Sequence, residues 1–542
     1  MQKNVTGFLK ALLAIGAAIA SGTLAILTFP PFELSFLAWF ALVPLLVIIS
    51  GKSIKYGFFL ALICGGVFFL GIFNWILEVP KYTHIHHAIL ALYLGSYYGV
   101  FGVAFCLIAG RLSVTLGLLA APFIWVSLEY VRSNMSFMAL PWGLLAHSQY
   151  QHPAVIQIAS FTGAYGITFL IVLVNSALAV LTMSASYRFS RGKFPRFQPL
   201  SQRLGKALIL AGAVCVTLSL AYGYKTIASP IKGKAIKVSV VQGNILQKRK
   251  WDEKYAPLIM KTYAGLTEEA AKDNPDLIIW PETATPRSIN KDRGIYREVR
   301  RIACKTSTYL LIGSSLRQKF RTQEPGPNIK YFNSAFLIDP ERGIPWKQRY
   351  HKIRLFPFGE YLPYKDTFPW ASIKVPKVGG YLPGKESTVF EHPDFRFGVT
   401  ICWENIFSDL FRQFVKRGAQ FMVNITNEAW FGKTAAPYQF VSMSVFRAVE
   451  NRVFVVRCAN TGISCFIDTC GRIFDRLKDK NGVDIFIQGV LTAPVIPLTS
   501  GSFYTRYGDW LAWLCFPCSM VFLFFALFIK SEDVNLTSQR HK

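Results

Sequence analysis

The sequence predicts a membrane protein built from a bundle of eight membrane-spanning helices and one α/β domain. Three observations predict this fold class. Of the 542 residues, 52% are hydrophobic, which is too high a share for an ordinary soluble enzyme of this size. Apolar runs of membrane-spanning length fill the first 223 residues and recur near residue 508. Between them, short β-rich runs alternate with helical segments, which is the pattern of an α/β domain.

The apolar runs are close to the ~20 residues that a helix needs to cross a bilayer. The first run occupies the position of a signal peptide, but it has no convincing cleavage site and further spans follow at once. We therefore expect it to be retained as a helix. The expected spans are residues 7–29, 32–50, 56–78, 86–109, 112–131, 163–184 and 205–223, with an eighth alone at 508–530.

The distribution of lysine and arginine predicts the orientation of these spans, because cytoplasmic loops are enriched in both. The basic residues precede the first span, follow the eighth, and lie between spans two and three, four and five, and six and seven. We therefore expect both termini to be cytoplasmic and residues 235–498 to lie outside. The formal net charge of +28 fits this topology better than a nucleic-acid partner, since no nucleic-acid-binding motif is present.

The outside segment 132–162 is too long and too apolar for a plain connector. Its composition fits a re-entrant or interfacial segment, and it equally fits a short amphipathic surface helix. We expect His147 and His152 to be polar anchors rather than metal ligands, because no third ligand is evident. The sequence predicts no cofactor, and the absence of a glycine-rich phosphate loop disfavours nucleotide chemistry.

These patterns divide the chain into residues 1–234 with seven spans, 235–498 as the α/β domain, and 499–542 with the eighth span and a cytoplasmic tail. About 260 residues are enough for one substantial core. Helical segments are expected at 252–273 and 405–417, and Cys465 and Cys470 can form a disulfide if this domain is outside the cytoplasm. The expected strands are 235–244, 276–280, 309–315, 333–339, 395–402, 420–426 and 453–460.

Cys402 stands where one of these strands ends and a helical stripe begins. Apolar residues alternate along FRFGVTIC and then adopt helical spacing from Ile406 to Phe414. A thiol at a helix start faces unpaired backbone N–H groups that favour the thiolate, as a nucleophile requires. The alternative is that Cys402 is a small buried apolar residue, as most cysteines are.

Two further candidates stand near strand ends: Glu282 in IIWPETATP and Lys352 in RYHKIRLFPFGEYLP. Taken singly, each is more simply a solvated surface residue. A carboxylate, an amine and a thiol at strand ends would converge on one edge of an α/β sheet, where such sheets place their sites.

The local motifs strengthen this hypothesis. WPET with Glu282, HK-x-x-L-x-PFGEY with Lys352 and Glu360, and CWEN with Cys402 resemble the Glu-Lys-Cys triad of the nitrilase or carbon–nitrogen hydrolase superfamily. Together with further motifs, they resemble the apolipoprotein N-acyltransferase family, over nearly the whole chain. Those further motifs are VQGNILQKRKW (241–251), NEAWFG (427–432), FRAVENR (446–452), NTG (460–462), LPWG and GAYGITFL.

The resemblance implies an α-β-β-α sandwich and a bacterial inner-membrane enzyme. It implies transfer of an acyl chain from a phospholipid to the α-amino group of a diacylglyceryl-cysteine on an apolipoprotein. In that reaction Glu282 would take the proton of Cys402, and the thiolate would attack the ester. The Lys352 ammonium and the Trp403 backbone N–H would stabilise the oxyanion. Trp403 departs from the family, whose members often carry tyrosine there.

Three further residues match family positions. Glu360 would orient Lys352 or the triad carboxylate. Glu404 would either act directly or be an ordinary acid at a helix start. Trp251 would lie near the acyl-binding region or be a core aromatic residue.

The runner-up function is a membrane-tethered amidase with water as the acceptor. A transporter with an outside domain is disfavoured, since the spans show no internal repeat and few charged residues.

Overall fold

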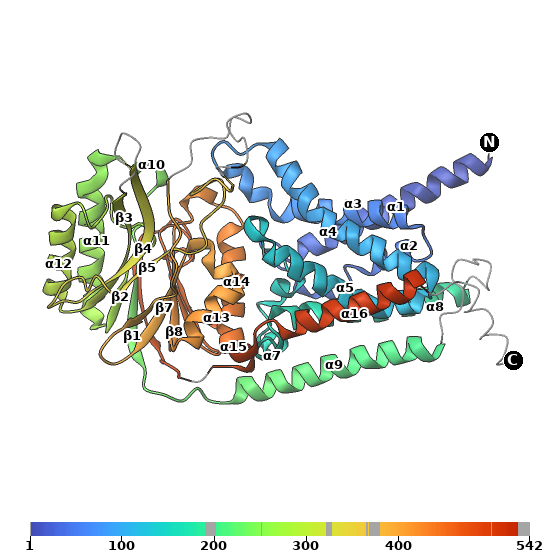
Figure 1. The fold of residues 1–542 in the computed structure, drawn as a ribbon. Helices are drawn as coiled ribbons and strands as arrows, with labels where there is room; N and C mark the ends of the chain where they lie inside the picture. Colours follow the sequence, from blue (N-terminus) through green and yellow to red (C-terminus); the bar gives the residue numbers. More distant parts are fainter. Residues whose placement is uncertain are drawn as a thin grey trace. The chain divides into compact units, whose positions relative to one another are not determined.

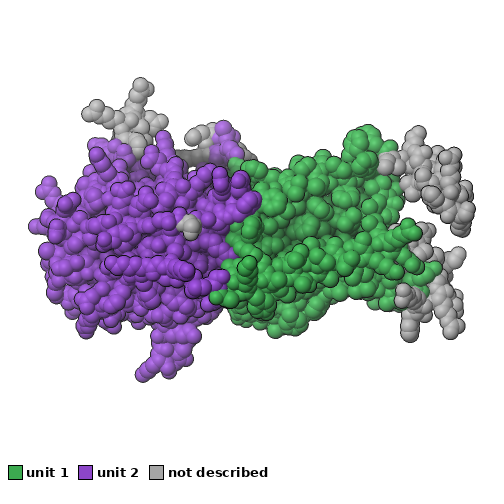
Figure 2. All heavy atoms as spheres, turned by 90° about the horizontal axis from the view of Figure 1, so that it is seen from below, with its two compact units in different colours: residues 1–228, 509–542 green, residues 229–508 purple. Residues whose placement is uncertain are grey.

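The computed structural model describes residues 2–189, 202–250, 252–320, 328–364, 367, 380–499 and 501–528. The chain forms two compact units, shown in different colours in Figure 2. The first consists of residues 1–228 and 509–542, and the second of residues 229–508. A membrane-type helical unit is thus interrupted by the insertion of a second unit before its last helix.

Seven helices among the described residues of the first unit are long and apolar enough to cross a membrane (Figure 1). They are α1 (Gln2–Leu27), α3 (Ile54–Ile72), α4 (His84–Arg111), α5 (Val114–Asn134), α8 (Ala164–Phe189), α9 (Gln202–Ala228) and α16 (Trp510–Phe528). The continuous helix expected over 32–50 is the exception and was wrongly predicted. There the chain forms the 3₁₀ helix η1 (Ser35–Trp39) and the short helix α2 (Val43–Ile49). The predicted count of eight spans is therefore approximate.

Helices α3 and α4 pack closely because glycines face each other across their contact. A methyl group added at Gly102 would lie 2.2 Å from the backbone oxygen of Gly57, and one added at Gly57 would lie 2.8 Å from that of Gly102. Small residues allow this approach, which is a common way for membrane helices to associate when lipid removes the hydrophobic driving force.

The segment expected to be re-entrant or superficial is packed inside the first unit. It contains η3 (Ser136–Met138), η4 (Leu145–Gln149), α6 (Pro153–Ile156) and α7 (Ala159–Thr162). Residues 141–150 are all buried, whereas residues 151–162, which include α6 and α7, have both exposed and buried positions. His152 Nε2 lies 2.6 Å from Ser35 Oγ, as expected for a polar anchor.

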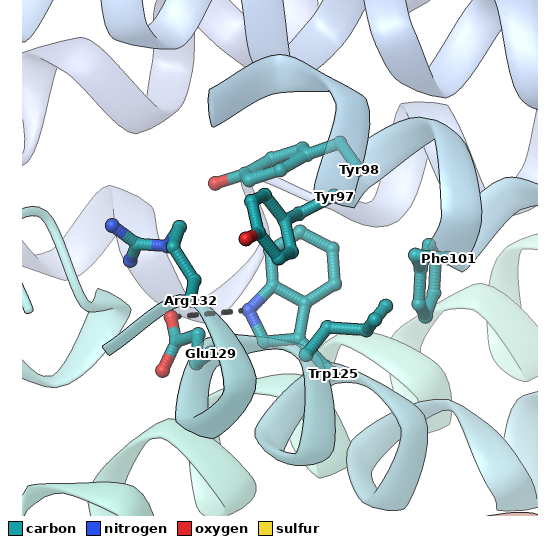
Figure 3. Close-up of a pocket in the computed structure, with 7 residues that line it drawn as sticks. Tyr97, Tyr98, Phe101, Trp125, Glu129 and Arg132 are labelled. Carbon is teal, nitrogen blue, oxygen red and sulfur yellow. Dashed lines mark hydrogen bonds between the residues drawn. The ribbon is translucent and has the colours of Figure 1, made fainter. Parts of the chain in front are cut away.

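Two charged side chains of α5 hold this segment. The Arg132 guanidinium donates to the carbonyl oxygens of Leu140 (2.8 Å) and Trp142 (2.7 Å). The Glu129 carboxylate accepts from the Leu145 backbone N–H at 3.1 Å and from the Trp125 indole at 3.2 Å. Both side chains lie in a small pocket whose wall also includes Tyr97, Tyr98, Phe101 and Leu128 (Figure 3). These charges therefore satisfy backbone groups that lipid could not.

The second unit contains two six-stranded sheets. The first has the order β12-β1-β2-β3-β4-β5 and the second the order β11-β10-β9-β8-β7-β6. The strands are β1 (Ile236–Gln242), β2 (Leu277–Ile279), β3 (Tyr309–Phe320), β4 (Asn328–Ile338), β5 (Arg349–His351), β6 (Val389–Glu391), β7 (Arg396–Ile401), β8 (Phe421–Thr426), β9 (Phe454–Ala459), β10 (Cys465–Ile467), β11 (Ile473–Arg476) and β12 (Gly489–Val495). The central pairs β1–β2, β2–β3, β7–β8 and β8–β9 are parallel.

The sheets pack face to face between two helical layers, so the expected α-β-β-α sandwich is confirmed (Figure 1). The Cys458 thiol on β9 bridges the sheets, because it donates to the carbonyls of Val241 (3.5 Å) and Ile279 (3.2 Å). The helices outside the first sheet are α11 (Ala256–Ala270) and α12 (Arg293–Thr306), and those outside the second are α13 (Ser408–Lys416) and α14 (Ala436–Asn451). Several short helical elements complete the described residues. In the first unit this is η2 (Asn74–Glu78), and in the second they are α10 (Gln247–Lys250), η5 (Glu253–Tyr255), η6 (Ala271–Asp273), η8 (Cys402–Ile406), η9 (Ala429–Phe431) and α15 (Phe503–Tyr507).

All ten cysteines are free thiols, including the buried pair Cys465 and Cys470. The disulfide left open by the sequence is therefore absent from this structure.

Candidate active site

The three residues expected to form the triad each follow a strand, but the strands belong to different sheets. Glu282 lies three residues after β2, and Lys352 directly after β5, both in the first sheet; Cys402 directly follows β7 in the second. The expectation that all three converge on one edge of a single sheet is therefore wrong. The sandwich brings β4 of the first sheet to β7 of the second. Glu282 and Lys352 lie 3.7 Å apart, and the charges of both act on the Cys402 thiol.

The Glu282 side chain is buried, and both of its oxygens are held. Oε1 accepts from the Asn333 side-chain amide at 2.7 Å, and Oε2 accepts from the Asn427 backbone N–H at 2.9 Å. Neither donor is positively charged. These two hydrogen bonds fix the orientation of the carboxylate, as a general base requires, and they do so without a short ion pair.

Lys352 is buried between two carboxylates. Its Nζ lies 2.9 Å from Oε2 of Glu360 and 3.7 Å from Oε1 of Glu282. Burial alone would lower the pKa of the ammonium, but the carboxylates of Glu360 and Glu282 help to outweigh it, and the pKa is raised. Lys352 therefore stays protonated and supplies a permanent positive charge to the site.

Glu360 is tied to the same group of residues. Its Oε1 accepts from Lys352 Nζ and from the Asn333 amide, both at 3.1 Å, and its Oε2 accepts from the Phe356 backbone N–H at 2.7 Å. Asn333 thus bridges Glu360 and Glu282. The structure places Glu360 beside Lys352, and its expected role of orienting Lys352 or the triad carboxylate stays a prediction.

Cys402 has a left-handed backbone conformation, with φ at +58°, at the end of β7. Its carbonyl oxygen accepts from the Asn424 side-chain amide at 3.2 Å. The α-helix expected to begin here does not: a 3₁₀ helix covers Cys402–Ile406, and α13 begins only at Ser408.

The expected preference for thiolate is accordingly wrong for the free protein. Burial raises the pKa of the Cys402 thiol, the negative charge of Glu282 raises it further, and Lys352 opposes both effects only in part. Cys402 is a thiol at neutral pH and needs a base to become a nucleophile. Glu282 is the carboxylate whose charge acts on it most strongly.

Glu404 is fully buried and joins the Cys402 strand to the Lys352 loop. Its Oε1 accepts from the Tyr350 hydroxyl (2.8 Å) and from the backbone N–H groups of Ile353 (2.6 Å) and Arg354 (2.9 Å). Its Oε2 accepts from the Ile401 N–H at 2.8 Å. Burial raises its pKa to about 7, although these hydrogen bonds oppose that rise. Glu404 therefore ties the backbone before Cys402 to the loop after Lys352, and its bond to the Ile401 N–H is also that of an acid in the first turn of η8.

Trp403 braces the same loop. Its indole N–H donates to the Arg354 carbonyl at 2.5 Å, and its ring packs edge-on against Phe356 and Phe407, with centroids 5.0 Å away in both cases. Trp251 lies outside the described residues, so its expected place near an acyl chain stays a prediction.

A buried polar network holds the backbone at Cys402. Arg457 and Glu428 are both inaccessible to solvent and are 2.6 Å apart. The Arg457 guanidinium also donates to Asn424 Oδ1 at 2.8 Å and to Ser444 Oγ at 2.9 Å. Because Asn424 in turn holds the Cys402 carbonyl, this network fixes the backbone that carries the thiol.

Sequence reasoning missed Asn333, Asn424 and Asn427, together with Lys250, whose Nζ donates to the Glu282 carbonyl at 2.8 Å. Asn427 and Lys250 lie within motifs already singled out, NEAWFG and VQGNILQKRKW, and Asn333 begins the expected strand 333–339. The signal was therefore present, but a neutral amide has no chemistry of its own that would mark it.

Within the described ranges, no cluster of three or more His, Cys, Asp or Glu side chains is arranged to hold a metal.

Two family models match the two parts of the chain. The family model for the apolipoprotein N-acyltransferase N-terminal domain matches residues 21–177, and that for carbon-nitrogen hydrolase matches residues 237–492. An amidase of the nitrilase superfamily from Nesterenkonia AN1 is similar to 53% of this chain and 98% of its own, at 15% identity and a TM-score of 0.37.

Two relatives match over nearly their whole length. The apolipoprotein N-acyltransferase of Chlorobaculum tepidum is 29% identical over 90% of this chain and 91% of its own. The apolipoprotein N-acyltransferase of Geobacter metallireducens is 36% identical over 92% of both chains. With a carbon–nitrogen hydrolase domain inserted into a membrane-type helical unit, the chain belongs to the apolipoprotein N-acyltransferase family.

Proposed function

We propose that the protein transfers a fatty acyl chain from a phospholipid to the α-amino group of a diacylglyceryl-cysteine at the N-terminus of an apolipoprotein. Cys402 carries the acyl chain between the two lipids as a thioester. The observation that supports this most directly is the grouping of a fixed carboxylate, a permanent ammonium and a thiol, inside a chain of this family.

In the first half-reaction, Glu282 takes the proton from Cys402 as the sulfur attacks the ester carbonyl of the phospholipid. The oxyanion that forms is stabilised by the Lys352 ammonium and by the Trp403 backbone N–H, which follows the nucleophile. The C–O bond then breaks, and the departing lysophospholipid oxygen takes the proton held by Glu282. A thioester remains on Cys402.

In the second half-reaction, the α-amino group attacks the thioester carbonyl. Glu282 takes a proton from the nitrogen, the C–S bond breaks, and the proton returns to the sulfur. An amide is more stable than a thioester, so the transfer runs downhill. The same oxyanion donors serve both steps, because each passes through a tetrahedral intermediate.

A membrane setting suits both substrates. A soluble enzyme would have to extract each chain from lipid at a cost of about 0.8 kcal/mol per CH₂ group. We place residues 235–498 on the periplasmic side of a bacterial inner membrane and both termini in the cytoplasm, following the distribution of lysine and arginine. Residues 1–234 and 499–542 supply the membrane helices in this proposal.

The experiment uses the purified full chain and a phospholipid labelled in its sn-1 acyl chain, with no acceptor. We expect a hydroxylamine-sensitive label on the wild type and none on Cys402→Ala. Cys304→Ser is the matched control, because Cys304 is an exposed cysteine of the same unit, on α12. Equal labelling of wild type and Cys402→Ala would refute the proposal. The amidase alternative is not favoured by the relatives, and it requires water to be as good an acceptor as a lipopeptide.

A further inference from the structure

Lys250 is a second buried lysine near the reacting thiol, and the reaction described above does not use it. It ends the short helix α10 and is 2% exposed. Its Nζ donates to the backbone carbonyl of Glu282 at 2.8 Å. Burying an ammonium is costly unless opposite charges compensate it, so its position requires an explanation.

The loop that carries Lys250 is fastened to the site at two other points. The Asn460 side chain accepts from the Ile245 N–H at 2.9 Å and donates to the Ile245 carbonyl at 2.7 Å. The Gln247 side chain accepts from the Asn427 amide at 2.9 Å. Asn427 is also the residue whose backbone N–H holds Glu282. The ammonium is thus delivered to Glu282 by a fixed loop, not by a free side chain.

The charges around the thiol show what this ammonium contributes. The ionisable groups that act on Cys402 include Glu282, Glu360, Lys352 and Glu428. Glu428 also raises the pKa of the thiol and is itself paired with Arg457. The two carboxylates of Glu282 and Glu360 and the one ammonium of Lys352 sum to a single negative charge. This charge opposes ionisation of the thiol. Lys250, on which both Glu282 and Cys402 act, brings the sum to zero.

We propose that Lys250 is a positioning residue for the acyl transfer: its ammonium fixes the backbone of Glu282 and balances the second carboxylate, so that Cys402 can give up its proton. This inference rests on the proposed function, because the thiolate is needed only if Cys402 is the nucleophile. Lys352 then stabilises the oxyanion, while Lys250 positions the base, Glu282.

The test compares four variants by two readouts. The first readout is the rate of acyl-enzyme formation from the labelled phospholipid, and the second is the rate of Cys402 alkylation by iodoacetamide at pH 7, where Lys250 is still charged. Lys250→Met removes the charge at similar length, Lys250→Gln keeps a neutral donor, and Lys250→Arg keeps the charge. Lys248→Met is the control, because Lys248 is an exposed lysine of the same helix.

For Lys250→Met and Lys250→Gln we expect acylation, and alkylation of Cys402 at pH 7, each to slow by about tenfold or more. Lys250→Arg should restore much of both, and Lys248→Met should match the wild type. A Lys250→Gln variant equal to the wild type would overturn the role of the charge. A Lys250→Met variant equal to Lys248→Met in both readouts would overturn the whole inference.

A further measurement does not depend on the neutral variants folding. Burial lowers the pKa of Lys250 to about 8, although Glu282 and Cys402 oppose that effect. Wild-type acylation should therefore fall as the pH rises above about 8, and Lys250→Arg should lack this fall. Identical profiles would contradict the inference. Alkylation needs no phospholipid, so an absent acyl-enzyme with an intact alkylation difference would refute the proposed function but not the role of Lys250.

Discussion

Lys352 Nζ and Glu360 Oε2 are 2.9 Å apart, closer than Lys352 is to Glu282. The stronger ion pair of the site therefore involves the supporting carboxylate and leaves Glu282 held by neutral donors. Because the closer ion pair is with Glu360, Lys352 stays charged and Glu282 stays available to accept a proton.

Glu360→Gln removes the larger of the charges that keep Lys352 protonated. We expect the pKa of Lys352 to fall, because the opposing effect of burial remains. Acyl-enzyme formation should slow by at least about tenfold, and in a Lys250→Arg background, which lacks the decline above about pH 8, it should decline at a lower pH than with Glu360 intact. The rate of label transfer across a pH series measures this. Glu386→Gln, an exposed acid of the same loop region, is the control. An unchanged profile would contradict the assignment.

Glu282→Gln should separate thiol reactivity from catalysis. The carboxylate raises the pKa of Cys402, so removing its charge lowers that pKa and increases the thiolate fraction at neutral pH. We expect faster alkylation of Cys402 by iodoacetamide, together with loss of acyl transfer. Lys352→Met should do the opposite to alkylation and slow it, because Lys352 lowers the thiol pKa. If Glu282→Gln slowed alkylation, the electrostatic account of the thiol would be wrong.

Arg457→Met leaves the Glu428 carboxylate buried without its partner. We expect the free energy of unfolding to fall by about 3–5 kcal/mol, and Glu428→Gln/Arg457→Met to recover part of this loss. Burial already raises the pKa of Glu428 to about 7, and loss of Arg457 raises it further. A carboxyl with a raised folded-state pKa binds its proton more tightly when folded, so the destabilisation grows from pH 5 to pH 8. Thermal unfolding in detergent at both pH values measures this, and a pH-independent loss would argue against a buried charge.

Gly102→Ala should destabilise the helical unit, because the added methyl group would lie 2.2 Å from the Gly57 carbonyl oxygen. Overpacking of this kind costs about 1–3 kcal/mol. Gly110→Ala on the same helix is the matched control, since a methyl group there meets nothing within 4 Å. We expect a lower unfolding temperature for Gly102→Ala alone. Equal temperatures for the two variants would show that α3 and α4 are not so closely packed.

The sequence predicted the fold class because its signals are strong and local. Spans of about 20 apolar residues and alternating strands such as β7 and β8 depend on few distant contacts. At 32–50 the chain forms η1 followed by α2 instead of one long helix, and many of its apolar residues are buried. Apolarity alone does not distinguish such a broken buried segment from a membrane-spanning helix. Short strands such as β5 and β10 were missed, because three residues carry too little periodicity.

The candidate site was predictable in its residue types but not in its geometry. Glu282, Lys352 and Cys402 were found from motifs, yet their origin in two sheets depends on packing that no local pattern encodes. The 3₁₀ helix that begins at the half-buried Cys402 and the raised pKa of its thiol are the opposite of the expected preference for thiolate. Lys250 escaped notice because a buried lysine is rare, and sequence alone makes it a surface residue.

The most direct test of the central claim is a chase of the isolated acyl-enzyme with a diacylglyceryl lipopeptide. The account predicts that the label leaves Cys402 and appears on the peptide in a hydroxylamine-resistant amide, at a rate at least equal to that of overall turnover. Release of the label as free fatty acid at the same rate with or without the lipopeptide would contradict it, because water would then be the true acceptor.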